Sequence, residues 1–263
     1  MSRVLDLLLS GGAFNQRLAA VLHSAVWARR LRHGNSDVPE MSLLDDLDLR
    51  GRIALDVGAH SGNWAVHLAG RVGTEGAVFA YEALPHYGRA LKGALRLLRV
   101  SNVHVRPVAI GNAQGEIALR WRSDDNQLLT GKTHIEPDAT PSSGVTEVPV
   151  TTLDQDLFTR GVRLSDVAFV KIDVEGAELD VLRGSYTLLK KGRPVVYLET
   201  EPEWAERLGH SVPEVFTEMN NHRYSPYLLT PAGAIPTDVD SYLKQYRARR
   251  AYNNVLFLPH AKL

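Results

Sequence analysis

The chain of 263 residues contains no cysteine. This absence excludes disulfides, thiolate metal sites and a cysteine nucleophile, but it leaves the cellular compartment open. An excess of one charge is also missing, because 30 Lys and Arg balance 30 Asp and Glu. No overall field therefore draws the protein to nucleic acid or to an anionic membrane surface, and we expect neither as a partner.

Long apolar runs are also absent. The N-terminal stretch MSRVLDLLLSGGAF is interrupted by Asp6 and lacks the long apolar part of a signal peptide. No later segment approaches the length of a membrane span. We therefore expect a cytoplasmic protein.

A helical pattern is present near the N-terminus. From Asn15 to Arg32, apolar residues recur near helical spacing, and three arginines stand at the C-terminal end, where the helix macrodipole favours cations. This pattern predicts a helical cap within residues 1–50, followed by one larger domain over residues 51–263.

Beyond residue 50, apolar runs alternate with amphipathic stretches. RIALDV, GAVFAYE and NVHVRPVAI have the pattern of strands, and NWAVHLAGRV and PHYGRALKGALRLLRV that of the helices between them. The alternation resumes at VAFVKIDVEG and predicts an α/β fold with a parallel sheet. Between these two parts, the strand-like IALRW and EVPVTT flank a polar segment, and we expect residues 122–146 to form a flexible loop or lid.

The turn after the first strand, DVGAHSGN, carries two glycines. Such a turn lets the backbone pass close to a ligand and directs free helix N–H groups at it. Gly58 and Gly62 are separated by Ala59, His60 and Ser61, so the G-x-G-x-x-G spacing that cradles a dinucleotide pyrophosphate is missing.

Two carboxylates accompany this turn. Asp56 precedes Gly58 by two residues, where it would repel a pyrophosphate and favour a ligand with cationic groups, such as the sulfonium and ammonium of S-adenosylmethionine. Glu82 follows Gly62 by twenty residues, at the end of the second strand, where it can accept ribose hydroxyls. The alternative is that Asp56 caps the turn and Glu82 is a surface carboxylate. Their spacing in one βαβ frame favours an adenosine cofactor.

The strand VAFVKIDVEG ends in Lys171, Asp173 and Glu175. A buried strand rarely carries three charges without a function, and ligands bind at the carboxyl ends of parallel strands. The alternative is an internal ion pair between Lys171 and Asp173 or Glu175 that only fixes the turn.

Five motifs together resemble the FkbM family of S-adenosylmethionine-dependent methyltransferases: LDVGAHSGNW, YEALP, VPVTTLD, FVKIDVEGAELDVLRG and VVYLE. They cover roughly residues 53–200. The resemblance implies a class I methyltransferase fold, which is Rossmann-like and has a seven-stranded, mostly parallel sheet of order 3-2-1-4-5-7-6 with the last strand antiparallel. It also implies methylation of a hydroxyl oxygen on a small molecule, such as a sugar or a secondary metabolite. Similar proteins often carry Asn where this chain has His60.

Methyl transfer to a hydroxyl requires removal of its proton. Asp173 or Glu175 could act as the base, or Asp173, Glu175 and Glu199 could hold Mg²⁺. The sequence does not choose between these. Lone histidines such as His60 are weaker candidates, because they are more often structural or exposed.

The expected site therefore has two parts. The catalytic residues are Asp173, Glu175 and Lys171, and a tentative metal pair is Asp173 and Glu199. The residues expected to bind S-adenosylmethionine are Asp56, Gly58, His60, Ser61, Gly62, Asn63, Glu82 and Asp173. Two other functions stay open, a nicotinamide-dependent oxidoreductase and a degenerate methyltransferase fold that acts as a binding module. The acceptor and a homo-oligomeric state are not decided by the sequence.

Overall fold

The computed structural model describes residues 13–32, 41, 47–123, 125, 127, 129, 133–136, 144–230, 233–249 and 253–260. Much of the expected loop at 122–146 lies outside these residues. Among the helices described, none has both the length and the apolar composition that a transmembrane span requires.

The main sheet has eight strands in the order β3-β2-β1-β8-β9-β12-β10-β11. Its strands are β1 (Ile53–Val57), β2 (Ala77–Tyr81), β3 (Val103–Arg106), β8 (Val167–Ile172), β9 (Val195–Glu199), β10 (Tyr224–Thr230), β11 (Gly233–Pro236) and β12 (Asn254–Pro259). The first seven positions follow the expected order 3-2-1-4-5-7-6, and β12 is antiparallel to both neighbours, as expected. The expected count of seven is wrong, because β11 pairs with β10 as an additional antiparallel edge strand.

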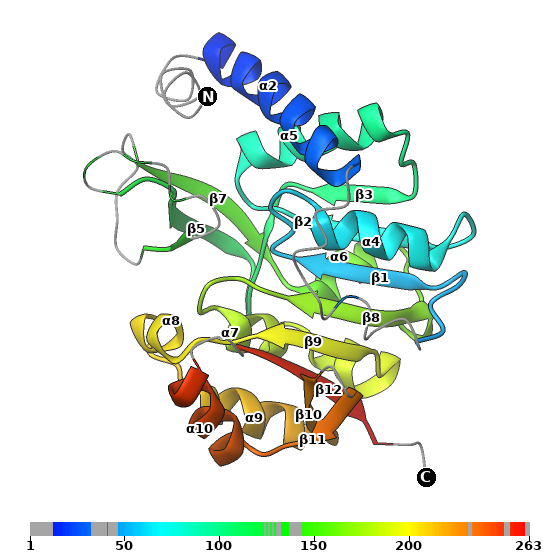
Figure 1. Cartoon of the computed structure of the whole chain (residues 1–263), viewed down its shortest axis with the longest axis vertical. Coiled ribbons are helices and arrows are strands. Elements are labelled where there is room, and N and C mark those ends of the chain that lie inside the picture. Colours follow the sequence, from blue (N-terminus) through cyan, green and yellow to red (C-terminus); the bar gives the residue numbers. More distant parts are fainter. Residues whose placement is uncertain are drawn as a thin grey trace.

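Helices cover both faces of this sheet (Figure 1). They are α2 (Ala13–Arg32), α4 (Asn63–Val72), α5 (Pro85–Leu98), α6 (Leu153–Thr159), α7 (Glu178–Arg183), α8 (Pro202–Arg207), α9 (Val212–Asn221) and α10 (Val239–Arg249), with short helices at Leu164–Asp166 and Leu188–Gly192. Successive residues of β1 enter opposite cores: Ala54 belongs to the core cluster that includes residues of α2, α4 and α5, and Leu55 belongs to the cluster that includes residues of α6, α7 and α9. Burial on both faces explains why β1 and β8 are nearly continuous apolar runs.

A second sheet of four strands, in the order β4-β7-β5-β6, projects from the main sheet (Figure 1). Its strands are β4 (Ala109–Ile110), β5 (Gly115–Arg120), β6 (His134–Ile135) and β7 (Val145–Thr151). β5 and β7 are the predicted strands IALRW and EVPVTT, but β6 lies within the segment expected to be a loop. NVHVRPVAI, expected to be one strand, is divided at Pro107 into β3 and β4, because proline has no N–H to donate to a ladder.

The predicted N-terminal helix is α2, which packs along α5 (Figure 1). Trp27 and Ala28 belong to the same core cluster as α4 and α5. The Ser24 hydroxyl, in the middle of the helix, lies 2.7 Å from the carbonyl oxygen of Ala20 in its own helix and 3.0 Å from that of Ala90 in α5, and it shares its proton between them. The helical part of the expected cap is thus continuous with the core of the α/β domain.

Candidate active site

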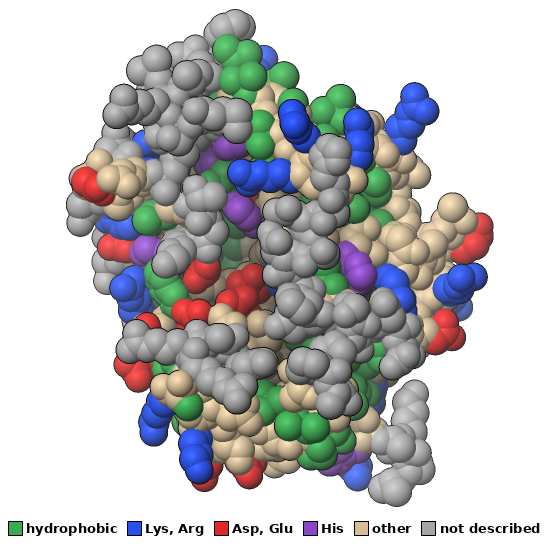
Figure 2. Space-filling view, in the orientation of Figure 1, with side chains coloured by type: hydrophobic (Ala, Val, Ile, Leu, Met, Phe, Trp, Pro, Cys, Tyr) green, Lys and Arg blue, Asp and Glu red, His purple; other side chains and the backbone are tan. Residues whose placement is uncertain are grey.

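A cavity lies where the carboxyl ends of β1, β2 and β8 meet the second sheet. The polar part of its wall includes Gly58, His60, Glu82, Asp173 and Glu175. The rest is mainly apolar, with contributions from β4, β5, β6 and the start of α5. Figure 2 shows that Asp and Glu side chains gather on this face of the molecule, between the second sheet and α8. The cavity therefore combines an apolar wall with an acidic one.

The two glycines of the first turn are required for different contacts. Gly58 has φ +82°, and a Cβ there would lie 1.8 Å from the carbonyl oxygen of Asp173. Gly62, at the N-terminus of α4, has φ +88°, and a Cβ there would lie 2.4 Å from Cδ1 of Leu91. Gly58 thus lets the turn approach β8, and Gly62 lets α4 approach α5. Ser61, Gly62 and Asn63 are not part of the cavity wall.

Glu82 lies at the end of β2 with 7% of its surface exposed. Its Oε2 accepts a hydrogen bond from the His60 N–H at 2.8 Å, and its Oε1 accepts one from the Leu84 N–H at 2.9 Å. Burial raises the pKa of Glu82 to about 7, although both N–H donors oppose the shift. Two backbone donors therefore fix the carboxylate, and each oxygen keeps a free lone pair for a ligand hydroxyl.

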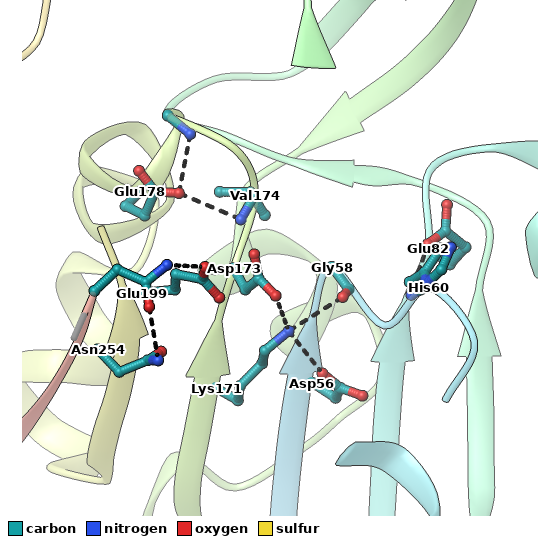
Figure 3. A network of polar contacts seen from close by, with 12 residues as sticks. Asp56, Gly58, His60, Glu82, Lys171, Asp173, Val174, Glu178, Glu199 and Asn254 are labelled. Atoms are coloured by element: carbon teal, nitrogen blue, oxygen red, sulfur yellow. Dashed lines mark hydrogen bonds and ion pairs between the residues drawn. The ribbon is translucent and has the colours of Figure 1, made fainter. Parts of the chain in front are cut away.

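Lys171 connects the first turn to the end of β8 (Figure 3). Its Nζ lies 2.9 Å from Oδ2 of Asp173, 3.2 Å from the carbonyl oxygen of Gly58 and 3.7 Å from Oδ1 of Asp56. Burial lowers the pKa of Lys171, but the carboxylates of Asp173 and Asp56 outweigh it, and the net shift is upward. The ammonium therefore stays charged and holds the two strand ends together.

Asp56 and Asp173 occupy opposite sides of this lysine. Asp56 is fully buried and does not line the cavity. Burial raises its pKa, and the nearby lysine opposes that shift. Asp173 lines the cavity and its side chain is 31% exposed. The ion pair considered from the sequence is thus present, yet one of its partners also faces the cavity.

Glu175 lines the same cavity from the turn that follows β8. Its backbone is left-handed, with φ +54°, a conformation that residues other than glycine adopt rarely. Burial raises its pKa to about 8, and the neighbouring carboxylates Asp173, Glu199, Glu201 and Glu178 add to the rise. Unlike Asp173, Glu175 makes no ion pair among the described residues.

Glu178 stabilises this left-handed turn through hydrogen bonds to its backbone, a role that was not predicted from the sequence. Its Oε1 accepts hydrogen bonds from the N–H groups of Val174 and Gly176, at 3.3 and 3.0 Å (Figure 3). Burial raises its pKa to about 7. The sequence signal was the spacing of Glu178 from the strand end, at the start of α7, where a carboxylate can cap free N–H groups.

Glu199, at the end of β9, accepts a hydrogen bond from the Asn253 side chain and is not part of the cavity wall. Burial raises its pKa, and repulsion from Asp173 adds to the shift. Among the described residues, no group of three or more His, Asp or Glu is placed to hold a metal ion. The magnesium hypothesis for Asp173 and Glu199 thus has no support from this part of the chain.

Most residues of the apolar wall were not predicted from the sequence. Tyr81 and Tyr87 come from β2 and α5, while the second sheet contributes Ile110, Ile117, Leu119 and Ile135. The alternating apolar residues Ile117 and Leu119 in GEIALR are a sequence signal for β5. The two-residue strands β4 and β6 are too short to show any alternation.

Comparison with solved structures supports the fold. A methyltransferase FkbM from Methylobacillus flagellatus is 16% identical, with a TM-score of 0.50 over 97% of this chain. This chain spans 58% of that protein's length. Cofactor-bound Rv0187 from MTB is 14% identical, with a TM-score of 0.50 over 94% of this chain and 90% of its own. At these identities the likeness concerns the fold alone.

Comparison of sequences identifies the family. None of the curated proteins compared with the chain matches it. The model of the methyltransferase FkbM domain matches residues 56–226, which is more than half of the chain. The match begins at Asp56, near the end of β1, and extends through Glu82 and the end of β8 into β10. The chain therefore belongs to the FkbM family of S-adenosylmethionine-dependent methyltransferases.

Proposed function

We propose that this protein transfers the methyl group of S-adenosylmethionine to a hydroxyl oxygen of a small molecule. The observation that carries the proposal is the Glu82 carboxylate, held by two backbone N–H groups in a cavity whose other charged wall is acidic. A carboxylate in this position accepts ribose hydroxyls. Acidic walls attract a sulfonium and an ammonium and repel a pyrophosphate.

The residues expected to hold the methyl donor divide by their position. Gly58 and His60 line the cavity with Glu82, so they would contact the donor directly. Asp56 and Lys171 are not part of the cavity wall, and they would act by fixing the position of the turn at Gly58. When bound, S-adenosylmethionine supplies the methyl carbon, and the carbon–sulfur bond breaks with its electron pair left on sulfur.

Glu175 is the base that we assign to the acceptor. The new bond forms between the acceptor oxygen and the methyl carbon, and the hydroxyl proton passes to a Glu175 oxygen. A carboxylate whose pKa is about 8 is a stronger base than an ordinary glutamate. Asp173, whose direction is fixed by Lys171, would orient the acceptor hydroxyl.

The apolar wall supplied by β4, β5 and β6 suits the carbon skeleton of the acceptor. A secondary metabolite with an apolar body fits this wall better than a free sugar does. Because Glu175 lines the same cavity as Ile117 and Leu119, the hydroxyl would face Glu175 while the skeleton contacts the two apolar side chains.

The test is a methyl-transfer assay with a deuterated methyl donor and fractionated hydroxyl-bearing metabolites, read by mass spectrometry. We expect the label to appear on oxygen in one class of product. Label on nitrogen or carbon would contradict O-methylation. Binding of S-adenosylhomocysteine without transfer to any fraction would favour a degenerate fold that acts as a binding module.

Two additional experiments test the oxidoreductase hypothesis and the metal hypothesis. S-adenosylhomocysteine should raise the melting temperature and NAD should not, because only a ligand of the native state stabilises it. Loss of turnover on exhaustive chelation, restored by Mg²⁺, would support a metal at Asp173 and Glu199.

A further inference from the structure

A cluster of aromatic rings joins the N-terminal helix to the first turn of the candidate site. The Trp27 ring of α2 lies 5.6 Å from the His60 ring and 5.5 Å from the Tyr87 ring, measured between centroids. The His60 ring meets Tyr87 edge-on at 5.0 Å. Trp27 is only 4% exposed. A residue outside the matched domain, 56–226, therefore contacts a residue of the cavity wall.

Besides the ring contact between Trp27 and Tyr87 of α5, other contacts hold the helix against α5. The Ser24 hydroxyl donates to the carbonyl oxygen of Ala90. A Cβ on Gly93 would lie 2.1 Å from the Ser24 Oγ, so the two helices approach each other closely at this point. The position of Trp27 is thus supported by helix packing at a place away from His60.

His60 needs such support. Its φ of +44° is left-handed, and a residue with a side chain keeps that conformation only where its surroundings impose it. The His60 N–H is one of the two donors that fix the Glu82 carboxylate. Burial lowers the pKa of the imidazole to about 4, so the ring is neutral and packs as an uncharged aromatic group.

We propose that α2 is part of the methyl-donor site and that Trp27 is a positioning residue for S-adenosylmethionine. Its ring, together with Tyr87, holds His60 in the left-handed conformation. This directs the His60 N–H at Glu82, and the carboxylate is then oriented toward the donor's ribose. The inference rests on the proposed donor site, and it adds that the helix preceding the matched domain controls donor affinity.

The test compares Trp27→Ala, Trp27→Leu and Trp27→Phe with Ser24→Ala as the matched control. Ser24→Ala weakens the packing of α2 on α5 but leaves the rings in place. Two properties are measured well below each melting temperature: the Kd for S-adenosylhomocysteine, and the exchange rate of the His60 amide in the ligand-free protein. The second needs no ligand.

We expect Trp27→Ala and Trp27→Leu to raise the Kd and to accelerate His60 exchange by about tenfold each, the effect of weakening one hydrogen bond to a charged group. Trp27→Phe should restore both values to within about twofold, because it keeps a ring against His60. KM for the donor should rise while kcat stays near the wild-type value. Ser24→Ala should lower only the melting temperature.

A wild-type Kd and wild-type His60 exchange in Trp27→Leu would overturn the inference, even if Trp27→Ala fails to fold. Equal effects of Ser24→Ala and Trp27→Leu would also overturn it, because general loosening of the helix would then explain both. If the wild-type protein does not bind S-adenosylhomocysteine, the proposed donor site fails. His60 exchange would still decide whether Trp27 fixes the turn.

Discussion

Replacing Glu175 by glutamine removes the proposed base while keeping its size and its place in the cavity wall. With a pKa of about 8, the ionised fraction of Glu175 rises from about 1% at pH 6 to about 10% at pH 7 and about 90% at pH 9. Turnover that depends on this ionised form should therefore increase about tenfold from pH 6 to 7 and about fivefold from pH 7 to 8, and then approach a plateau near pH 9. In Glu175→Gln, kcat should fall by about 100-fold and lose this pH dependence.

Glu178→Gln is the matched control, since it is the same change three residues away, outside the cavity wall. It removes one of the carboxylates that raise the pKa of Glu175, so the pH profile should move to lower pH while the plateau is kept. The melting temperature should stay near the wild-type value, because the glutamine carbonyl oxygen can still accept from the Val174 and Gly176 N–H groups. The assay is single-turnover methyl transfer from pH 6 to 9 under donor saturation. A Glu175→Gln plateau within twofold of wild type, with the same profile, would refute the assignment of the base.

Three other changes test the site. Gly58→Ala should destabilise the fold by about 3 kcal/mol or more, because its Cβ would collide with the Asp173 carbonyl. The control is Gly161→Ala, which should cost about 1 kcal/mol, because Gly161 is also left-handed but a Cβ there would meet nothing within 4 Å. Equal losses of the two variants in urea unfolding would contradict this reasoning. Asp173→Asn should lower kcat by about 100-fold, because Asp173 orients the acceptor hydroxyl. Its cost in stability should be smaller than the about 3–5 kcal/mol of an orphaned buried charge, because Lys171 still has Asp56 as a partner. Calorimetric unfolding that shows the larger loss, with unchanged turnover, would reduce Asp173 to an ion-pair partner. Burial raises the pKa of Glu175 and Glu178 from 4.5 to about 8 and about 7, so they bind protons more tightly in the folded state, and stability falls as pH rises from about 4.5 to about 8. The ligand-free melting temperature should therefore rise as pH falls from 8 to 7, and a fall over that window would contradict the upward pKa shifts.

The order of the main sheet could be predicted because its central strands are buried on both faces. Ala54 and Leu55 face opposite cores, which makes β1 a continuous apolar run that ends sharply at the glycine turn. The resemblance then supplied the order of the strands. The extra edge strand β11 was missed, because GAIP is short and mostly exposed and so carries no burial pattern.

The location of Glu82 and Asp173 could also be predicted, because the carboxyl ends of neighbouring parallel strands meet at one edge. Their partners could not. The sequence left open whether Lys171 pairs with Asp173 or with Glu175. The pairing with Asp173 depends on the left-handed backbone of Glu175, which directs the Glu175 side chain away from Lys171. The contact between Trp27 and His60 joins residues 33 positions apart through helix packing, which no local pattern encodes.

Titration calorimetry of S-adenosylhomocysteine against the wild type and Glu82→Ala tests the central claim most directly. Glu82→Ala removes charge-assisted hydrogen bonds to the ribose worth about 1.5–3 kcal/mol, so the Kd should rise by roughly 10- to 150-fold. We expect one site per chain in the wild type and no heat of binding from NAD. An unchanged Kd in Glu82→Ala, or binding of NAD in place of S-adenosylhomocysteine, would contradict a methyl-donor site in this cavity.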